Sequence, residues 1–401
     1  MSGTSTNTGV ALGGAAGSVG WDDDPVVTAW PGLAALPGNR TADACVIGLG
    51  GSGLAAVGAL LERGLSVLGV DAGRVAAGAA GRNGGFLLGG AAAYLHTAVA
   101  QWGEAAAVQV YRATLAELRG LAHALGGDVV RRVGAIRLAG LPGEPRTGAE
   151  AEDRVRELGD CAEHAGALRA HGFAVEEYDG PLGQGLYLPE DAAMNPARRA
   201  LALAAALAPR AALHEQTAVA RVEPGRVTTE RGVISASVVI VAVDGRLEVL
   251  LPQLLGRVRT ARLQMLATAP LTVRPLPCPV YGRWGYDYAQ QSADGRLFVG
   301  GGRDRFLQQE WTLDAAPTPN VQGYLDGLAE RMAGAPVQVT HRWAASVGYT
   351  PDGRPLCAEV DDGVIAIGGY NGTGNLVGPV AARAAVALAL DGAAPPAYFA
   401  S

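Results

Sequence analysis

The chain contains no lysine, so arginine supplies every strongly basic side chain among its 401 residues. This absence excludes enzymes that need a Schiff-base lysine and nucleotide-binding proteins that need the lysine of a phosphate-binding loop. The formal net charge is -6, and no basic run or basic amphipathic helix is present. Because proteins that bind nucleic acids carry a basic patch, we expect no nucleic-acid partner.

Cysteine and long apolar segments are scarce as well. The four cysteines, Cys45, Cys161, Cys278 and Cys357, lie far apart and form no CxxC pair, so neither a metal site nor a redox motif is indicated. The N-terminus lacks the basic start and apolar core of a signal peptide, and the most apolar predicted helix, over residues 200–209, is too short to span a bilayer. We therefore expect a soluble, cytoplasmic protein with no membrane partner.

Glycine is abundant, with 58 residues, and it is most informative near the start of the chain. Residues 44–47 form an apolar run typical of a buried parallel strand, and an apolar helical pattern covers residues 54–61. Between them, Gly48 permits a tight turn, Gly50 lets a pyrophosphate approach the backbone, and Gly53 lets the helix pack on the strand. Since a helix N-terminus also attracts phosphate, this strand–turn–helix unit predicts a dinucleotide site.

The next segment indicates which dinucleotide is bound. A second apolar strand over residues 65–70 ends at Asp71, whose carboxylate is placed to accept hydrogen bonds from a ribose. Residues 76–85 then read AAGAAGRNGG, a run of small residues whose backbone can lie against a large flat cofactor. A flexible glycine loop is the alternative reading of this run.

Taken together, these motifs resemble the FAD-dependent amine and D-amino-acid oxidase family. The branches that the sequence resembles are glycine oxidase, sarcosine oxidase and gamma-glutamylputrescine oxidase, and the GRNGG wording is closest to the last. Later segments match the family in order, namely residues 186–203, 214–223, 227–245, 342–356 and 363–376, with Ala345 where the family signature has glycine.

The resemblance implies an α/β fold, in which a Rossmann-like FAD-binding domain is interleaved with an α+β substrate domain on a mixed or antiparallel sheet. We expect the FAD-binding domain to comprise residues 41–90, 186–250 and 343–395, the substrate domain residues 91–185 and 251–342, and the N-terminal tail and lead-in residues 1–40, of which 1–20 form a mobile tail. Patterning predicts helices over residues 98–125, 147–171 and 318–332, a hairpin over 129–138, and strands over 257–267, 284–290 and 296–300.

The resemblance also implies which residues contact a non-covalent FAD, with attachment through Cys357 as the covalent alternative. The expected contacts are Gly48, Gly50, Gly51, Ser52 and Gly53 in the first turn; Asp71, Ala72 and Gly73 after the second strand; Ala80, Gly81, Arg82, Asn83, Gly84 and Gly85 in the small-residue run; and Val219, Ala242, Gly369, Gly372, Thr373, Gly374, Asn375 and Leu376 in later segments.

The expected reaction is hydride transfer from an amine to flavin, for which the protein supplies position and a dry pocket and no catalytic base is obligatory. The candidate substrate-site residues are Tyr288, Arg303, Phe86 and Tyr370. Tyr286, Tyr288 and Gln290 are predicted to share one face of a strand, where Tyr288 either meets substrate or packs across strands. Arg303 either reaches the pocket or pairs with Asp304 on the surface.

Two departures from the family bear on the substrate. Val347 and Gly372 occupy the positions where relatives that use amino acids hold the carboxylate with arginines, so a small amino acid is disfavoured unless Arg303 or Arg283 substitutes. An amine, an N-substituted amine or a bulky amino-acid derivative is favoured instead.

The electron acceptor stays open between O2, giving H2O2, and another acceptor, because the lysine that assists the oxygen reaction in some relatives is absent. A nicotinamide dehydrogenase and a non-catalytic flavin-binding protein are the alternative functions. The oligomeric state stays open.

Overall fold

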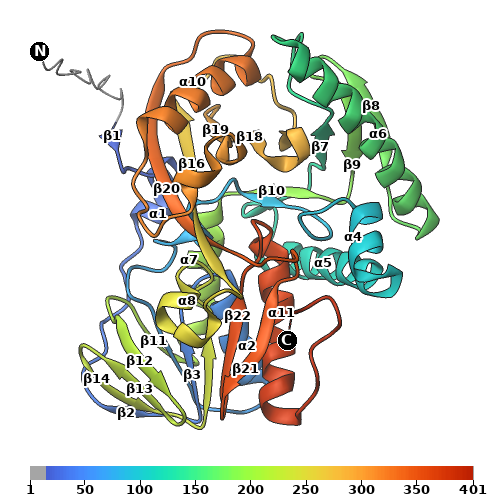
Figure 1. Cartoon of the computed structure of the whole chain (residues 1–401). Helices are drawn as coiled ribbons and strands as arrows, with labels where there is room; N and C mark the ends of the chain where they lie inside the picture. Colours follow the sequence, from blue (N-terminus) through green and yellow to red (C-terminus); the bar gives the residue numbers. More distant parts are fainter. Residues whose placement is uncertain (1–14, 401) are drawn as a thin grey trace, which may run out of the picture.

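The computed structural model describes residues 15–400, which form four β-sheets with helices packed between and around them (Figure 1). Residues 1–14 of the predicted mobile tail lie outside the described residues. The rest of that tail prediction is wrong, because residues 15–16 form strand β1 (Ala15–Ala16) and a 3-10 turn, η1 (Gly20–Asp23), follows. No helix within residues 15–400 combines the length and apolarity needed to cross a membrane.

A six-stranded sheet forms the lower half of the molecule in Figure 1. Its order is β11 (Ala212–His214), β4 (Val67–Val70), β3 (Ala44–Ile47), β15 (Val238–Val241), β22 (Val364–Gly368) and β21 (Leu356–Asp361). All neighbouring strands are parallel except β21 and β22. The first predicted strand is confirmed, and the second begins two residues later than predicted.

Alternate residues of β3 are buried on opposite faces of this sheet, because both faces are covered by other elements. Ala44 and Val46 pack with helices α2 (Gly51–Glu62), α7 (Pro196–Leu207) and α11 (Gly374–Asp391). Cys45 and Ile47 pack with the small sheet made of β12 (Val219–Glu223), β13 (Arg226–Thr229), β14 (Gly232–Ser235) and β2 (Arg40–Thr41). The carboxyl ends of the parallel strands are thereby left facing the upper half.

A nine-stranded mixed sheet forms the upper half. Its order is β1, β20 (Val339–Tyr349), β16 (Arg259–Thr268), β19 (Leu297–Gly300), β18 (Asp287–Gln291), β17 (Val280–Gly282), β7 (Ala135–Leu138), β9 (Gly183–Leu188) and β8 (Glu176–Gly180). One face is covered by α10 (Pro319–Ala333), through Val321, Leu325 and Leu328. The other face shares a core with the six-stranded half, through Met265, Phe298 and Trp343.

Two predictions about residues 98–138 are wrong. The predicted helix over 98–125 is two helices, α4 (Leu95–Trp102) and α5 (Glu104–Leu125), because Gly103 with φ 85° breaks the chain between them. The predicted hairpin does not form either. Strand β6 (Val130–Arg131) joins β10 (Ala192–Met194) and β5 (Phe86–Leu87) in a three-stranded sheet, whereas β7 belongs to the nine-stranded one.

Other predicted elements agree better with the structure. Helix α6 (Gly148–Ala170) is capped by Thr147, whose hydroxyl accepts a hydrogen bond from the Glu150 amide at 3.1 Å, and β16, β19 and α10 lie where expected. Segment 214–223 is divided between β11 and β12. The remaining short elements are α1 (Pro25–Thr28), α3 (Ala79–Arg82), α8 (Leu247–Leu250), η2 (Pro252–Leu254), η3 (Arg283–Gly285), η4 (Arg303–Phe306) and α9 (Leu307–Glu310).

The strand predicted over residues 284–290 is only partly correct. Arg283 and Trp284 have φ values of 49° and 58°, so the chain turns there and β18 begins only at Asp287. Tyr286 consequently lies outside the strand and is 42% exposed, whereas Tyr288 and Gln290 share one strand face.

Candidate cofactor and substrate site

A cavity of about 1000 Å³ separates the carboxyl ends of the parallel strands from one face of the nine-stranded sheet. On the six-stranded side its wall includes Ile47, Val70 and Ala242, each at the end of a parallel strand or directly after one. On the other side it includes Met265 and Tyr288. Ligands of open α/β sheets bind at this edge, which makes the cavity the candidate site.

The first glycine turn forms one end of the cavity. Gly48 has φ 95°, and a Cβ atom there would lie 2.8 Å from the Ala242 carbonyl oxygen. A Cβ atom on Gly53 would lie 1.7 Å from the Gly48 oxygen, so Gly53 acts by packing and lies outside the cavity wall. Helix α2 begins at Gly51 without a side-chain cap, which leaves its first amide groups available to an anion. Gly48, Gly50, Gly51 and Ser52 all line the cavity.

Asp71 follows β4, and its carboxylate holds two neighbouring backbone segments by hydrogen bonds. Its Oδ2 accepts a hydrogen bond from the Leu49 amide at 2.8 Å, and its Oδ1 accepts one from the Gly73 amide at 2.9 Å. Burial raises the pKa of Asp71, while these two amide donors oppose that shift. Asp71 and Ala72 line the cavity, whereas Gly73 lies behind them.

The small-residue run is held in place through its carbonyl groups. The Trp21 indole donates to the Asn83 oxygen at 2.9 Å, the Trp343 indole donates to the Arg82 oxygen at 2.8 Å, and the Gln290 amide donates to the Gly84 oxygen. These contacts argue against a free glycine loop. Ala80, Arg82, Asn83 and Gly84 line the cavity, whereas Gly81 and Gly85 face other backbone.

The start of α11 closes the same end of the cavity. This second helix N-terminus brings Gly372, Thr373, Gly374, Asn375 and Leu376 to the cavity wall. Val219 on β12 and Ala242, directly after β15, line the cavity as well. Gly369 does not line the cavity. Cys357 lies in the core on β21, and burial raises the pKa of its thiol to about 12. It is not part of the cavity wall.

Of the cavity residues that were not identified from the sequence, Arg199 and Asp244 link separate segments of the chain. Arg199 on α7 is 2% exposed, and its Nη2 donates to the Asn375 carbonyl oxygen at 3.0 Å. The Nη1 atom of Arg199 lies close to Gly51 at the start of α2, and its Nε atom has no hydrogen-bond partner. Arg199 forms no ion pair with any residue in 15–400. Burial lowers the pKa of Arg199 to about 10. An uncompensated cation between two helix N-termini fits a bound pyrophosphate.

Asp244, the second of these residues, ties three segments together. Its Oδ2 accepts a hydrogen bond from the Gly348 amide at 3.2 Å, and its Oδ1 accepts one from the Tyr370 amide at 3.2 Å. Burial raises the pKa of Asp244 to about 6. Neither residue had a local sequence signal, because both act on segments more than 100 positions away.

Tyr288 lies where the two halves of the molecule meet. A Cβ atom on Gly84 would come within 3.0 Å of its ring, and one on Gly300 within 2.4 Å, so the ring lies between the small-residue run and β19. Phe86 contacts the ring edge-on, with centroids 5.8 Å apart, and both residues line the cavity. Tyr288 therefore packs across strands and also faces the cavity. Gln290 is occupied by hydrogen bonds to the Gly84 and Met194 oxygens.

Arg303 faces the cavity and does not pair with Asp304. Its guanidinium carbon lies 4.4 Å from the Trp311 ring centroid and 4.0 Å from that of Tyr349. Asp304 pairs with Arg283, which also binds Asp287, so Arg283 is not free to take a substrate.

Val347 and Gly372, for which the sequence resemblance implies arginines in relatives that use amino acids, both line the cavity. Tyr370 is mostly buried in the core around α2 and α11, and only part of it reaches the cavity wall.

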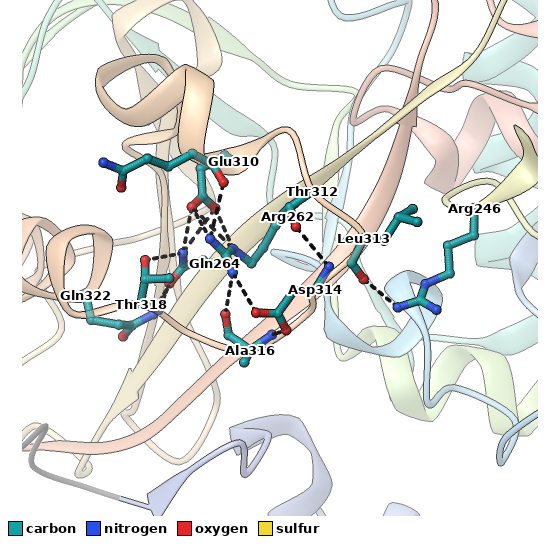
Figure 2. A network of polar contacts seen from close by, with 11 residues as sticks. Arg246, Arg262, Gln264, Glu310, Thr312, Leu313, Asp314, Ala316, Thr318 and Gln322 are labelled. Atoms are coloured by element: carbon teal, nitrogen blue, oxygen red, sulfur yellow. Dashed lines mark hydrogen bonds and ion pairs between the residues drawn. The ribbon is translucent and has the colours of Figure 1, made fainter. Parts of the chain in front are cut away.

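The segment that carries Trp311 is anchored by a buried polar network (Figure 2). Arg262 and Glu310, which are 5% and 1% exposed, form an ion pair at 2.8 Å. Gln264 donates to Glu310 at 3.0 Å and to the Thr318 hydroxyl at 2.8 Å, so Thr318 does not cap α10 with its side chain. The network fixes residues 310–318 over the β16 strand, beside the cavity.

Comparison with known proteins agrees with this geometry. The family model described as DAO, FAD dependent oxidoreductase, matches residues 43–388. A protein described as probable oxidoreductase OrdL from Rhizobium meliloti (strain 1021) is 29% identical over 381 residues, which cover 88% of this chain and 84% of that protein.

Two solved structures illustrate the similarity of fold. Glycine oxidase from Geobacillus kaustophilus superposes with a TM-score of 0.67 at 21% identity, over 87% of this chain and 94% of that one. L-proline dehydrogenase from P. horikoshii superposes with a TM-score of 0.70 at 17% identity, over 91% and 97%.

Proposed function

Since this chain belongs to the FAD-dependent oxidoreductase family, we propose that it oxidises the C–N bond of an amine or an N-substituted amino acid. The family assignment removes the nicotinamide dehydrogenase alternative. The observation that carries the proposal is that one cavity runs from the glycine turn at Gly48 to the aromatic wall at Tyr288. A substrate against that wall is enclosed together with the cofactor site.

The residues present fit FAD. The first amides of α2 and the guanidinium of Arg199 would hold the pyrophosphate, and Asp71 would bind the ribose next to the adenine. The small-residue run and the start of α11 would hold the flavin ring system through backbone amides. We infer non-covalent binding, because Cys357 is buried away from the cavity.

When bound, FAD accepts the hydride that leaves the substrate carbon, and the resulting imine is hydrolysed by water. The chain contributes position and exclusion of water. No histidine or glutamate within residues 15–400 lines the cavity, and the lining carboxylates of Asp71 and Asp244 both accept backbone hydrogen bonds. This arrangement supports oxidation of an amine that binds in its neutral form, with no protein base.

Tyr288 and Phe86 would form the apolar wall against the substrate, Arg303 on η4 would face the substrate from another part of the cavity wall, and Tyr370 would contribute just before α11. We propose O2 as the acceptor, giving H2O2. Because the chain has no lysine to assist the reaction with oxygen, a dehydrogenase that uses another electron acceptor is the alternative form of the same proposal.

The test uses the purified full-length holoenzyme. A panel of primary and N-substituted amines and amino acids is added without oxygen, and the visible flavin absorbance is followed. Loss of that absorbance with any member supports the proposal, and subsequent admission of air with assay of H2O2 separates oxidase from dehydrogenase. If no member of the panel reduces the flavin, amine oxidation is the wrong reaction.

A further inference from the structure

Arg137 on β7 is a cavity residue that the proposed reaction does not yet use. Its register partner on β17 is Tyr281, whose own partner on β18 is Tyr288. Residues in register on neighbouring strands share a face of the sheet. Arg137, Tyr281 and Tyr288 therefore form one row across the cavity side of the nine-stranded sheet, and all three line the cavity.

The guanidinium of Arg137 is buried between two tyrosines. Its carbon lies 4.1 Å from the Tyr94 ring centroid and 4.7 Å from that of Tyr281. The residue is 7% exposed, and its Nε and Nη1 atoms are buried with no hydrogen-bond partner. Because the rings cover its faces and the Tyr94 and Tyr281 side chains interact with it, the part of the guanidinium that lines the cavity is what remains for a ligand.

The carboxylates around Arg137 are occupied elsewhere. Glu157 accepts hydrogen bonds from the Tyr94 hydroxyl at 3.2 Å and from the Gly140 amide at 2.7 Å. Asp191 accepts one at Oδ1 from the Gly89 amide at 2.8 Å; its Oδ2 has no partner, and burial raises the pKa of Asp191 to about 7. Neither forms an ion pair with Arg137 in the described part of the chain. A buried cation that only neutral tyrosines contact and that has no ion pair is costly, and an anion that pairs with it gains correspondingly.

We propose that Arg137 binds a carboxylate group of the substrate, an assignment that rests on the proposed amine oxidation. A planar guanidinium with free edge donors matches a carboxylate through two parallel hydrogen bonds. The substrate would then be an amino acid or N-substituted amino acid oriented with its carboxylate toward β7. Val347 lies on β20 and Gly372 lies just before α11. Both would line a part of the cavity wall away from the bound carboxylate.

The test titrates oxidised holoenzyme with phenylacetate and, separately, with its uncharged analogue phenylacetamide. Isothermal titration calorimetry measures the affinity for each. Wild type is expected to bind the acid more tightly than the amide by about tenfold or more. Arg137→Met is expected to remove that preference, with Arg137→Gln as a second variant that retains a polar group. Arg112→Met, at an exposed position on α5, controls for the loss of one positive charge.

Thermal unfolding separates binding from a structural role. Loss of an unpartnered buried charge should leave the melting temperature of ligand-free Arg137→Met equal to or above that of wild type, whereas a structural arginine would lower it. The proposal is overturned if wild type binds acid and amide equally, or if Arg137→Met keeps the preference. It is also overturned if Arg303→Met removes the preference and Arg137→Met does not.

The amine-reduction assay is independent of this titration. If every amine fails to reduce the flavin while phenylacetate still binds through Arg137, the carboxylate site stands and the proposed reaction is wrong. If amines reduce the flavin and Arg137 makes no difference to phenylacetate, the reaction stands and the carboxylate site is wrong.

Discussion

The side-chain amides of Asn83 and Asn375 hydrogen-bond to each other in both directions, with nitrogen–oxygen distances of 3.2 and 3.0 Å. The pair joins the small-residue run to the start of α11, across 292 sequence positions. Asn83 Oδ1 also accepts a bond from the Gly85 amide at 2.8 Å, and Asn375 donates to the Phe86 oxygen at 2.8 Å. Two segments of the cofactor site therefore depend on one reciprocal contact.

We expect Asn83→Ala and Asn375→Ala each to lower the free energy of unfolding by about 1–3 kcal/mol, since each leaves buried polar groups unpaired. The double variant should lose less unfolding free energy than the two single variants together. Urea unfolding should give a coupling energy of about 0.5–3 kcal/mol. Asn39→Ala, which removes a bond to the Val233 amide on the distant small sheet, should be additive with Asn83→Ala. Additivity in the Asn83/Asn375 pair would contradict the coupling.

Gly53 and Gly58 provide a matched comparison within α2. A Cβ atom on Gly53 would lie 1.7 Å from the Gly48 oxygen, whereas one on Gly58 would meet nothing closer than Leu207 at 3.8 Å. Gly53→Ala should therefore displace the helix from β3, with a loss of about 3 kcal/mol or more and of bound FAD. Gly58→Ala should be neutral or stabilising by up to about 1 kcal/mol. Thermal unfolding and flavin content of the purified proteins measure both effects.

The parts of the fold that were predictable depend on local pattern. The turn at Gly48, the strands on either side of α2 and the extent of helix α6 each follow from the pattern of neighbouring residues. The break at Gly103 was not predicted, because apolar periodicity continues across it and a single glycine is tolerated in many helices.

The parts that were not predictable depend on contacts between distant segments. Arg199 meets the start of α2 only because α7 packs beside that helix, and nothing near position 199 indicates it. Similarly, the sequence could not show whether Arg303 pairs with Asp304 or faces the cavity. It faces the cavity because Arg283 forms the ion pair with Asp304. In the turn at Trp284 two non-glycine residues, Arg283 and Trp284, adopt positive φ next to Gly285, so the predicted strand began too early.

Removal of the Arg199 charge tests its role at the pyrophosphate. Arg199→Met is expected to weaken FAD binding by about tenfold or more, because a charge-assisted contact is lost while the helix termini remain. The apo form should be little destabilised, since the buried charge has no ion pair there and the variant loses only the hydrogen bond to the Asn375 oxygen. Fluorescence titration of apoprotein with FAD gives the affinity, and urea unfolding gives the stability. Unchanged affinity together with lower stability would indicate a purely structural arginine.

The buried pair of Arg262 and Glu310 should respond asymmetrically to substitution. Glu310→Ala leaves Arg262 without its main partner and is expected to cost about 3–5 kcal/mol of unfolding free energy. Arg262→Met combined with Glu310→Leu removes both charges and should recover most of that loss. Urea unfolding of the three proteins checks the order. If the double variant is as unstable as Glu310→Ala, the unpaired charge is not the cause.

Asp191 should make stability depend on pH near neutrality. Burial raises its pKa to about 7, while the Gly89 amide and Arg137 act in the opposite direction. An unfolded aspartate has a pKa of about 3.9, so between about pH 4 and about pH 7 the folded protein binds more protons than the unfolded chain. Stability contributed by the protonated carboxyl is therefore complete below that range and is lost as the pH rises through about 7.

Asp191→Asn keeps an oxygen that can accept the Gly89 hydrogen bond but removes the titration. We expect the variant to gain stability relative to wild type as the pH rises from about 4 to about 7, by a slope of up to roughly 1.4 kcal/mol per pH unit, with no further gain above that range. Thermal and urea unfolding across that range measure the difference, and exposed Asp128→Asn controls for the loss of one carboxylate. A difference that does not change with pH would show that Asp191 is ionised throughout, so that Arg137 is already neutralised from within the protein.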